Sequence, residues 1–232
     1  MTKIIHPYAH RLGILRDWRS RWYAGSAKKN REFIRTDAMI RRFVTERLKG
    51  AYLSHIEIER SQKDLRVQIH TARPGMVIGR SGEGATKLKK DLAQRLKEMK
   101  LSQVPALHID IIEVRQPESN AAIVAAMVTE SLEKRLPFRR VLKQTIDKVM
   151  ANRDVKGVRI ALSGMLGTGS MSRKEELKKG RIPLQTLRAD IDYAQVAASL
   201  PLGKIGVKVW IYRGDIFADQ RTAARPSGAQ NQ

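Results

Sequence analysis

The sequence contains no cysteine among its 232 residues, and only 5% of them are aromatic. The lack of cysteine excludes disulfide bonds and thiolate zinc sites, and it fits a reducing compartment. With so few aromatic side chains, the protein has little means of binding a partner mainly through stacking. No apolar run reaches the roughly 18 residues that a membrane-spanning helix needs, and no signal-peptide pattern opens the chain. We therefore expect a cytoplasmic protein that does not bind membranes.

Acidic residues are also scarce. The chain has 23 Asp and Glu but 45 Lys and Arg, which gives a formal charge of +22. A surface so positive repels itself unless a polyanion neutralises it, which favours a nucleic acid as partner. Phosphate and sugar contacts should then dominate the binding. The plain alternative is a basic protein that its charge keeps soluble.

The first 35 residues combine many basic side chains with Trp18, Trp22, Tyr23 and Phe33 and show no clean periodicity. This mixture predicts a basic arm that lies on RNA and pairs with its phosphates. A simpler interpretation, which we prefer for Trp18 and Trp22, is that the aromatic residues dock the arm to the protein. The cations of the arm that we expect to contact RNA are Arg11, Arg19, Arg21, Lys28 and Lys29.

Residues 36–117 predict the order helix, strand, strand, short helix, Gly-rich loop, helix, strand. Thr36 is expected to cap the first helix, and apolar residues alternate with polar ones near Ile58 and Val67. The next long helix is predicted over residues 83–99 and the last strand over 107–114. This order is typical of the type II arrangement of the K-homology (KH) RNA-binding module.

The loop Gly79-Arg80-Ser81-Gly82 is the most informative motif of this segment. Two glycines without Cβ atoms allow the backbone to approach a phosphodiester closely, and the following helix begins with free N–H groups. A GxxG sequence alone is usually a turn, but its place between two helices matches the loop with which KH modules clamp a nucleic-acid backbone. The residues expected to contact RNA here are Gly79, Arg80, Ser81, Gly82 and Lys87.

Beyond Pro117, we expect helices over residues 119–136 and 138–152, and strands over 158–162, 184–191 and 205–212. The run 172–181 is interpreted as a charged loop or short helix. The predicted fold class is therefore α+β: an N-terminal arm, a type II KH domain, and a C-terminal α+β domain with two helices packed on a mainly antiparallel sheet. The expected domain limits are 1–35, 36–117, 118–215 and a disordered tail over 216–232.

No catalytic residue, metal site or cofactor is predicted. The glycines around Gly79 and Gly164 have the spacing of a phosphate-binding loop, but both stretches lack the lysine that such loops require. His6 and His10 have helical metal-ligand spacing but flank Pro7 in an irregular arm. An RNA or DNA lyase or nuclease would need a reactive lysine or paired carboxylates, which we do not identify.

Arg139, Arg140 and Lys143 avoid the apolar stripe of the helix predicted over residues 138–152. A solvated helix face is the default interpretation, but the charge of the whole chain favours contact with phosphate.

The chain resembles small-subunit ribosomal protein three of the bacterial type over nearly its full length. The matching segments are His6-Pro7, Arg11-Leu12-Gly13, Trp18, residues 20–24, residues 73–82, Phe138-Arg139-Arg140, residues 180–193 and residues 206–212. It departs from the family between residues 163 and 179, notably at Met165 and Glu176-Leu177, and it has His6 where an asparagine is usual.

The resemblance implies a place in the head of the small ribosomal subunit and binding to that subunit's RNA. It also implies contacts with small-subunit proteins two, ten and fourteen, and a position beside proteins four and five where messenger RNA enters. Arg139, Arg140 and Lys143 match residues that help to open messenger structure there. The alternative is a free KH protein acting outside the ribosome, which would be expected to carry several KH copies.

Overall fold

The computed structural model describes residues 5–61, 63–99, 106–167, 171–201 and 203–217. The chain divides into two compact units, one of residues 18–117 and one that joins residues 1–17 to residues 118–232. Among the described residues, no helix has the length and apolar character needed to cross a membrane.

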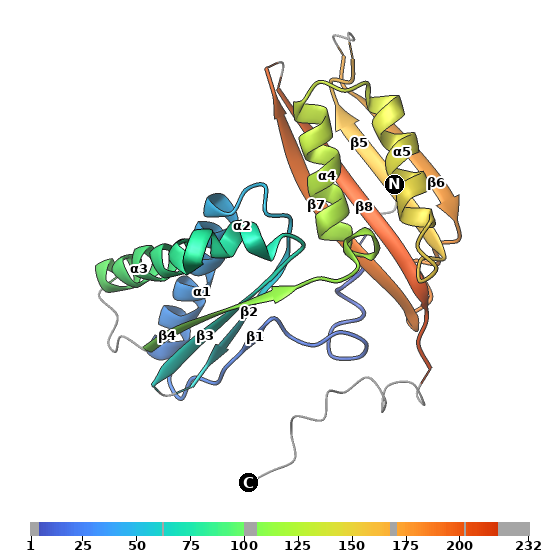
Figure 1. Ribbon diagram of the computed structural model, residues 1–232. Coiled ribbons are helices and arrows are strands. Elements are labelled where there is room, and N and C mark those ends of the chain that lie inside the picture. Colours follow the sequence, from blue (N-terminus) through green and yellow to red (C-terminus); the bar gives the residue numbers. More distant parts are fainter. Residues whose placement is uncertain (1–4, 62, 100–105, 168–170, 202, 218–232) are drawn as a thin grey trace. The chain divides into compact units, whose positions relative to one another are not determined.

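The unit of residues 18–117 packs helices on one face of a four-stranded sheet (Figure 1). The strands lie in the order β1-β2-β3-β4; β2 and β3 are antiparallel, and the two outer pairs are parallel. The elements are β1 (Ser20–Arg21), α1 (Ala27–Arg47), β2 (Leu53–Arg60), β3 (Asp64–Thr71), α2 (Pro74–Ile78), the 3-10 turn Arg80–Gly82, α3 (Glu83–Glu98) and β4 (Ala106–Glu113).

The core of this unit is built from residues that recur every two positions on the strands and every three to four positions on the helices. Ile58 and Val67 are fully buried on the strands, and Leu92 is fully buried on α3, where leucines recur every four residues. The opposite face of the sheet has no helix in this unit, and it carries polar residues such as His55 and Glu57.

Helix α1 begins ten residues earlier than the sequence predicts. Its N-cap is Ser26, whose Oγ accepts a hydrogen bond from the Lys29 backbone N–H at 3.3 Å. Thr36 is no cap but is buried within the helix, where its hydroxyl donates to the Glu32 carbonyl at 2.6 Å. The prediction was wrong because residues 27–35 are mostly polar and exposed, which hides the helical period.

The second unit packs two helices on one face of an antiparallel sheet of order β6-β5-β8-β7 (Figure 1). Its core joins Val128, Ile146 and Val209, one residue from each helix and one from the central strand β8. The elements are α4 (Ala121–Glu133), α5 (Phe138–Met150), β5 (Gly157–Gly164), β6 (Arg173–Gly180), β7 (Ala189–Leu200) and β8 (Gly203–Asp215), after a 3-10 turn at Pro117–Ser119. The predicted α+β fold class is confirmed.

Two strand predictions in this unit are corrected. The charged run 172–181 contains strand β6, which lies at the sheet edge, so most of its charged side chains point into solvent. Strand β7 begins at Ala189 rather than at residue 184. Residues 184–188 instead form a bend and a turn, and Arg11 donates to the Leu184 and Thr186 carbonyls there. Most of the predicted tail, residues 218–232, lies outside the described residues.

Candidate RNA-binding surfaces

The loop between α2 and α3 adopts a backbone that favours glycine. Gly79, Ser81 and Gly82 have positive φ angles of 71°, 49° and 80°. A Cβ on Gly79 would lie 3.0 Å from the backbone N of Gly84, so the loop turns tightly against the start of α3. The loop therefore presents mainly backbone at its tip, as the GxxG interpretation requires.

Positive charge surrounds this tip. Gly82 occupies the N-cap position of α3 without a side-chain cap, so the first N–H groups of a 16-residue helix lack that partner. Arg80, Ser81 and Lys87 are exposed. Within the described ranges, neither Arg80 nor Lys87 makes an ion pair. The arrangement suits an anion, and the predicted residues of the motif do lie together.

The predicted cations of the arm have separate locations in the structure. Lys28 and Lys29 are exposed in the first turn of α1, not in an irregular arm. Arg19 and Arg21 are also exposed, and the Arg21 guanidinium lies 3.0 Å from Glu59 and 3.5 Å from Glu57. These four residues remain available to a polyanion.

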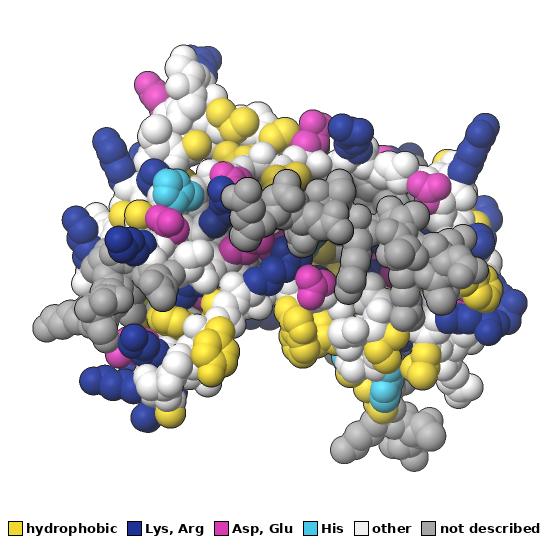
Figure 2. All heavy atoms as spheres, turned by 90° about the horizontal axis from the view of Figure 1, so that it is seen from below, with side chains coloured by type: hydrophobic (Ala, Val, Ile, Leu, Met, Phe, Trp, Pro, Cys, Tyr) yellow, Lys and Arg dark blue, Asp and Glu magenta, His cyan; other side chains and the backbone are white. Residues whose placement is uncertain are grey.

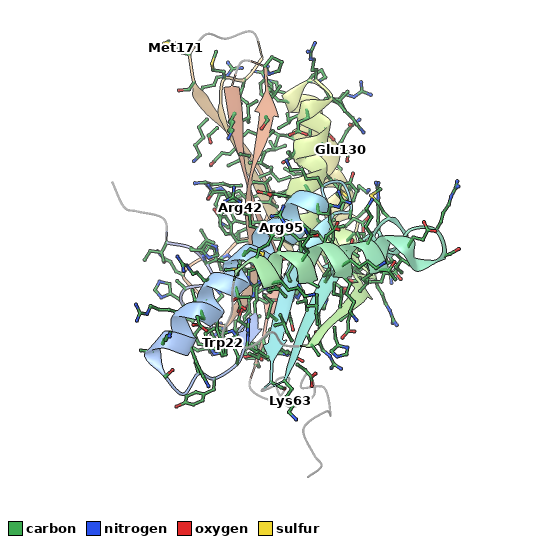
Figure 3. The ribbon with its side chains drawn as sticks, turned by 90° about the vertical axis from the view of Figure 1, so that its left-hand side faces the viewer. Trp22, Arg42, Lys63, Arg95, Glu130 and Met171 are labelled. Carbon is green, nitrogen blue, oxygen red and sulfur yellow. The ribbon has the colours of Figure 1, made fainter. Side chains whose placement is uncertain are left out.

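Trp22 anchors the segment that precedes α1. Its indole N–H donates to Asp37 at 2.8 Å, and its ring meets Phe33 edge to face, so Trp22 lies against α1 (Figure 3). The docking interpretation fits Trp22. It does not fit Trp18, which is 59% exposed.

Arg11 contradicts its predicted role as an RNA contact. It is 1% exposed, and its guanidinium donates to the backbone carbonyls of Pro7, Leu184, Thr186 and Ala189 at 2.8–3.0 Å. The side chain therefore binds the N-terminal segment to the second unit. Sequence reasoning counted its charge but had no signal for partners more than 170 positions away.

A second buried network beside Arg11 was not predicted. The Asp192 carboxylate, 5% exposed, accepts hydrogen bonds from Arg213 at 3.0 Å, from the Ala121 backbone N–H at 2.8 Å and from the Tyr8 hydroxyl. Arg16 lies 3.5 Å away. Burial alone would raise the Asp192 pKa, but the attraction of Arg16 and Arg213 outweighs it and lowers that pKa.

Burial and the Asp192 charge raise the pKa of Tyr8 to about 12, so Tyr8 keeps its proton as the donor in this network. The network holds residues 5–17 on the second unit by charge and hydrogen bonding. Its members hydrogen-bond to one another and to the backbone, which is typical of a structural network.

The three cations predicted on the helix after Pro137 all lie near the start of α5. Arg139, Arg140 and Lys143 are exposed, and the side chain of Arg139 is 74% exposed. The nearest carboxylate to Arg139 is Glu175 at 4.0 Å, while Arg140 and Lys143 have no ion pair among the described residues. Little of their charge is neutralised within the protein.

Basic side chains are not confined to one patch. Figure 2 shows Lys and Arg side chains spread over the visible face, with fewer acidic ones between them. A surface of this kind suits a long polyanion that wraps several sites rather than a small ligand held at one place.

The sequence patterns of two protein families match the chain. One is described as a KH domain and matches residues 39–119. The other is described as the C-terminal domain of ribosomal protein S3 and matches residues 128–211. The KH match contains the 79–82 loop, and the S3 match contains α5.

Curated relatives are similar over nearly the whole chain, and each is a small ribosomal subunit protein uS3. The protein of Caldicellulosiruptor bescii is 44% identical, covering 98% of this chain and 99% of the relative. That of Clostridium novyi is 42% identical, covering 95% and 96%, and that of Lactobacillus acidophilus is 42% identical over the full length of both. The resemblance found in the sequence is thereby confirmed, and the chain belongs to the uS3 family of small ribosomal subunit proteins.

Proposed function

We propose that the protein is a structural constituent of the small ribosomal subunit head, where it binds the RNA of that subunit and lines the path of incoming messenger RNA. The observation that carries the RNA-binding part is the 79–82 loop. Its glycine backbone, the exposed Arg80 and the start of α3, which has no side-chain cap, offer three kinds of phosphate-binding group at one place. Family membership supports the ribosomal location.

RNA contacts are assigned to the exposed members of the predicted set. They are Gly79, Arg80, Ser81, Lys87, Arg19, Arg21, Lys28 and Lys29, together with the partly exposed Gly82, whereas Arg11 is removed because it is buried. Small-subunit proteins two, ten and fourteen are the proposed neighbours in the head, and proteins four and five those beside the messenger path. The role is one of binding and positioning, without a reaction of its own.

The messenger contact is assigned to α5, because three exposed cations near its start have no carboxylate closer than 4.0 Å among the described residues. Changing Arg139, Arg140 and Lys143 to alanine should leave folding nearly intact, since exposed changes seldom cost more than about 0.5 kcal/mol each. Ribosomes that carry this variant should translate a stable hairpin more slowly and an unstructured message at the parent rate. The measurement is the elongation rate on the two matched messages.

The matched control removes three other exposed cations of the same unit: Arg153, Lys178 and Lys204. This control should translate both messages like the parent protein. Both variants and the parent should sediment with the small subunit. A parent chain found only as free protein would contradict the ribosomal assignment, and equal rates on both messages for the α5 variant would contradict the messenger contact.

A further inference from the structure

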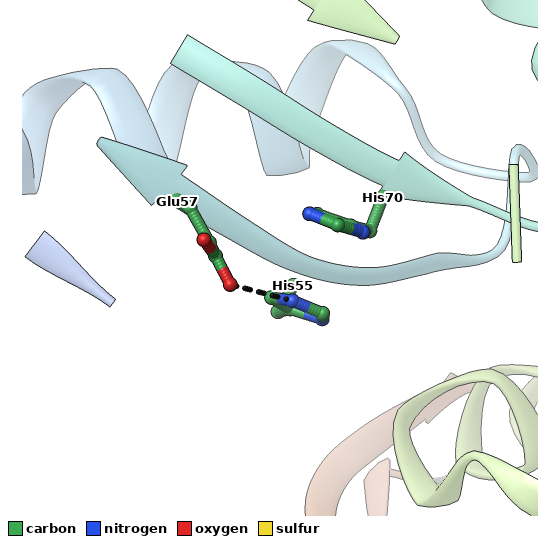
Figure 4. A group of neighbouring side chains, drawn as sticks. All are labelled: His55, Glu57 and His70. Atoms are coloured by element: carbon green, nitrogen blue, oxygen red, sulfur yellow. Dashed lines mark hydrogen bonds and ion pairs between the residues drawn. The ribbon is translucent and has the colours of Figure 1, made fainter. Parts of the chain in front are cut away.

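Three metal-ligating side chains meet on the face of the first unit's sheet that α1 and α3 do not cover. His55 and Glu57 lie two positions apart on β2, so they point to the same side. His70 is the direct antiparallel partner of His55 on β3. Figure 4 shows the three side chains converging there from the two strands.

The distances bring three ligand atoms within reach of one ion. One nitrogen of each histidine and one oxygen of Glu57 all lie within 4.8 Å of one another. The His55 Nε2 is 3.2 Å from the Glu57 Oε1. Tetrahedral zinc bonds of 2.0–2.1 Å place ligand atoms roughly 3.3 Å apart, so one pair already has that spacing.

A change in the tilt of the two histidine rings would bring both ring nitrogens to zinc-binding distance of one ion. They are stacked with centroids 4.1 Å apart and an interplanar angle of 12°, so their ring planes are nearly parallel. Rotation about the Cβ–Cγ bond is soft for histidine, so the two nitrogens can turn toward a shared ion.

The groups around the three side chains resemble the outer shell of a metal site. The Ser54 hydroxyl lies 2.8 Å from the His55 Nδ1, so it can accept a hydrogen bond from the Nδ1–H when Nε2 binds a metal. Arg21 lies 3.5 Å from the other oxygen of Glu57 and orients the carboxylate. A cation between the Nε2 and the Glu57 Oε1 would satisfy both electron-rich atoms.

His70 supplies an independent sign of a missing partner. Its Nε2 is buried and has no hydrogen-bond partner among the described residues, which is an unfavourable state for a ring nitrogen. The site is nevertheless reachable, because the side chains of His55 and Glu57 are 25% and 21% exposed. The His70 Nε2 is therefore available as a ligand, and an ion can reach it from solvent.

We propose that His55, Glu57 and His70 form a binding site for a divalent transition-metal ion, with zinc as the best match. Two imidazole nitrogens and one carboxylate oxygen suit zinc, cobalt or nickel better than magnesium or calcium, which prefer oxygen ligands alone. Water would complete the tetrahedron. The sequence shows metal-ligand spacing only at His6 and His10, and His55 and His70 looked scattered. This set was missed because its ligands meet only when β2 pairs with β3.

The test is titration of the full chain, purified without RNA and stripped of metal by a chelator, with zinc by calorimetry and with cobalt by visible absorption. We expect one site, with a cobalt spectrum of tetrahedral type. His70→Ala and Glu57→Gln should each lower the affinity at least about tenfold, because even outer-shell changes reach that size. His108→Ala, which removes an exposed histidine of β4, should bind like the parent.

Glu57→Gln keeps the size and shape of the side chain. This variant therefore still tests the proposal if circular dichroism shows that His70→Ala is misfolded. The proposal is overturned if the parent binds no zinc, or if neither variant lowers the affinity. A cobalt spectrum of the octahedral, aqueous type would also overturn it.

Discussion

Small-subunit RNA is expected to bind about a hundredfold more weakly when Arg80 and Ser81 are both replaced by aspartate. The double change removes one cation and adds two anions at the tip of the loop that we propose to bind phosphate. A hydrogen bond to a charged group contributes about 1.5–3 kcal/mol, and repulsion between like charges adds to its loss. Both residues are exposed, so the fold should survive. The measurement is the dissociation constant at fixed salt.

The matched control places the same charges elsewhere on the same unit. Ser61→Asp with Lys63→Asp alters the turn between β2 and β3, where both residues are exposed (Figure 3). This variant should lose much less affinity, because only the general charge changes. If both double variants weaken binding equally, the glycine loop has no special role and the RNA responds only to net charge.

Replacing Asp192 with asparagine should destabilise the second unit by about 3 kcal/mol at pH 7. Arg16 and Arg213 both pair with two carboxylates, Asp190 and Asp192, and the change removes the more deeply buried of them. Breaking a buried pair costs about 3–5 kcal/mol. For a chain of this size, the melting temperature should fall by roughly 6–12 °C. Calorimetry gives the shift, and hydrogen exchange of β7 and β8 locates it.

The pH dependence distinguishes this charge effect from a packing defect. Because the folded-state pKa of Asp192 is lowered, its contribution is complete above the ordinary Asp pKa of about 3.9 and is lost as pH falls through the folded value. The difference between parent and variant should therefore shrink below about pH 4. Asp147→Asn, at an exposed pair with Lys179, should change the stability little. A difference that stays constant with pH would contradict the account.

The elements predicted well from the sequence are those in which buried apolar residues recur at one regular spacing. Alternating residues such as Ile58 and Val67 marked the strands, and the leucines around Leu92 marked α3. Strand β6 and the first turns of α1 were missed because they are exposed and charged, so no apolar period reveals them. In those segments, pairing with β5 and the cap at Ser26 decide the structure.

The candidate sites divide in the same way. The 79–82 loop and the cations of α5 are local in sequence, and the structure places each set together. Arg11 was misassigned, and the Asp192 network and the His55 cluster were missed, because their partners come from distant segments. A charge count cannot distinguish a buried arginine from an exposed one.

The salt dependence of RNA binding by the full chain tests the central claim most directly. Each phosphate neutralised by an exposed cation releases counterions and contributes roughly −0.7 to −0.9 to the slope of log affinity against log salt. A handful of contacts by residues such as Arg80, Lys87 and Lys28 predicts a slope of about −4 to −6 on small-subunit RNA. A slope near zero would contradict binding through the phosphate backbone.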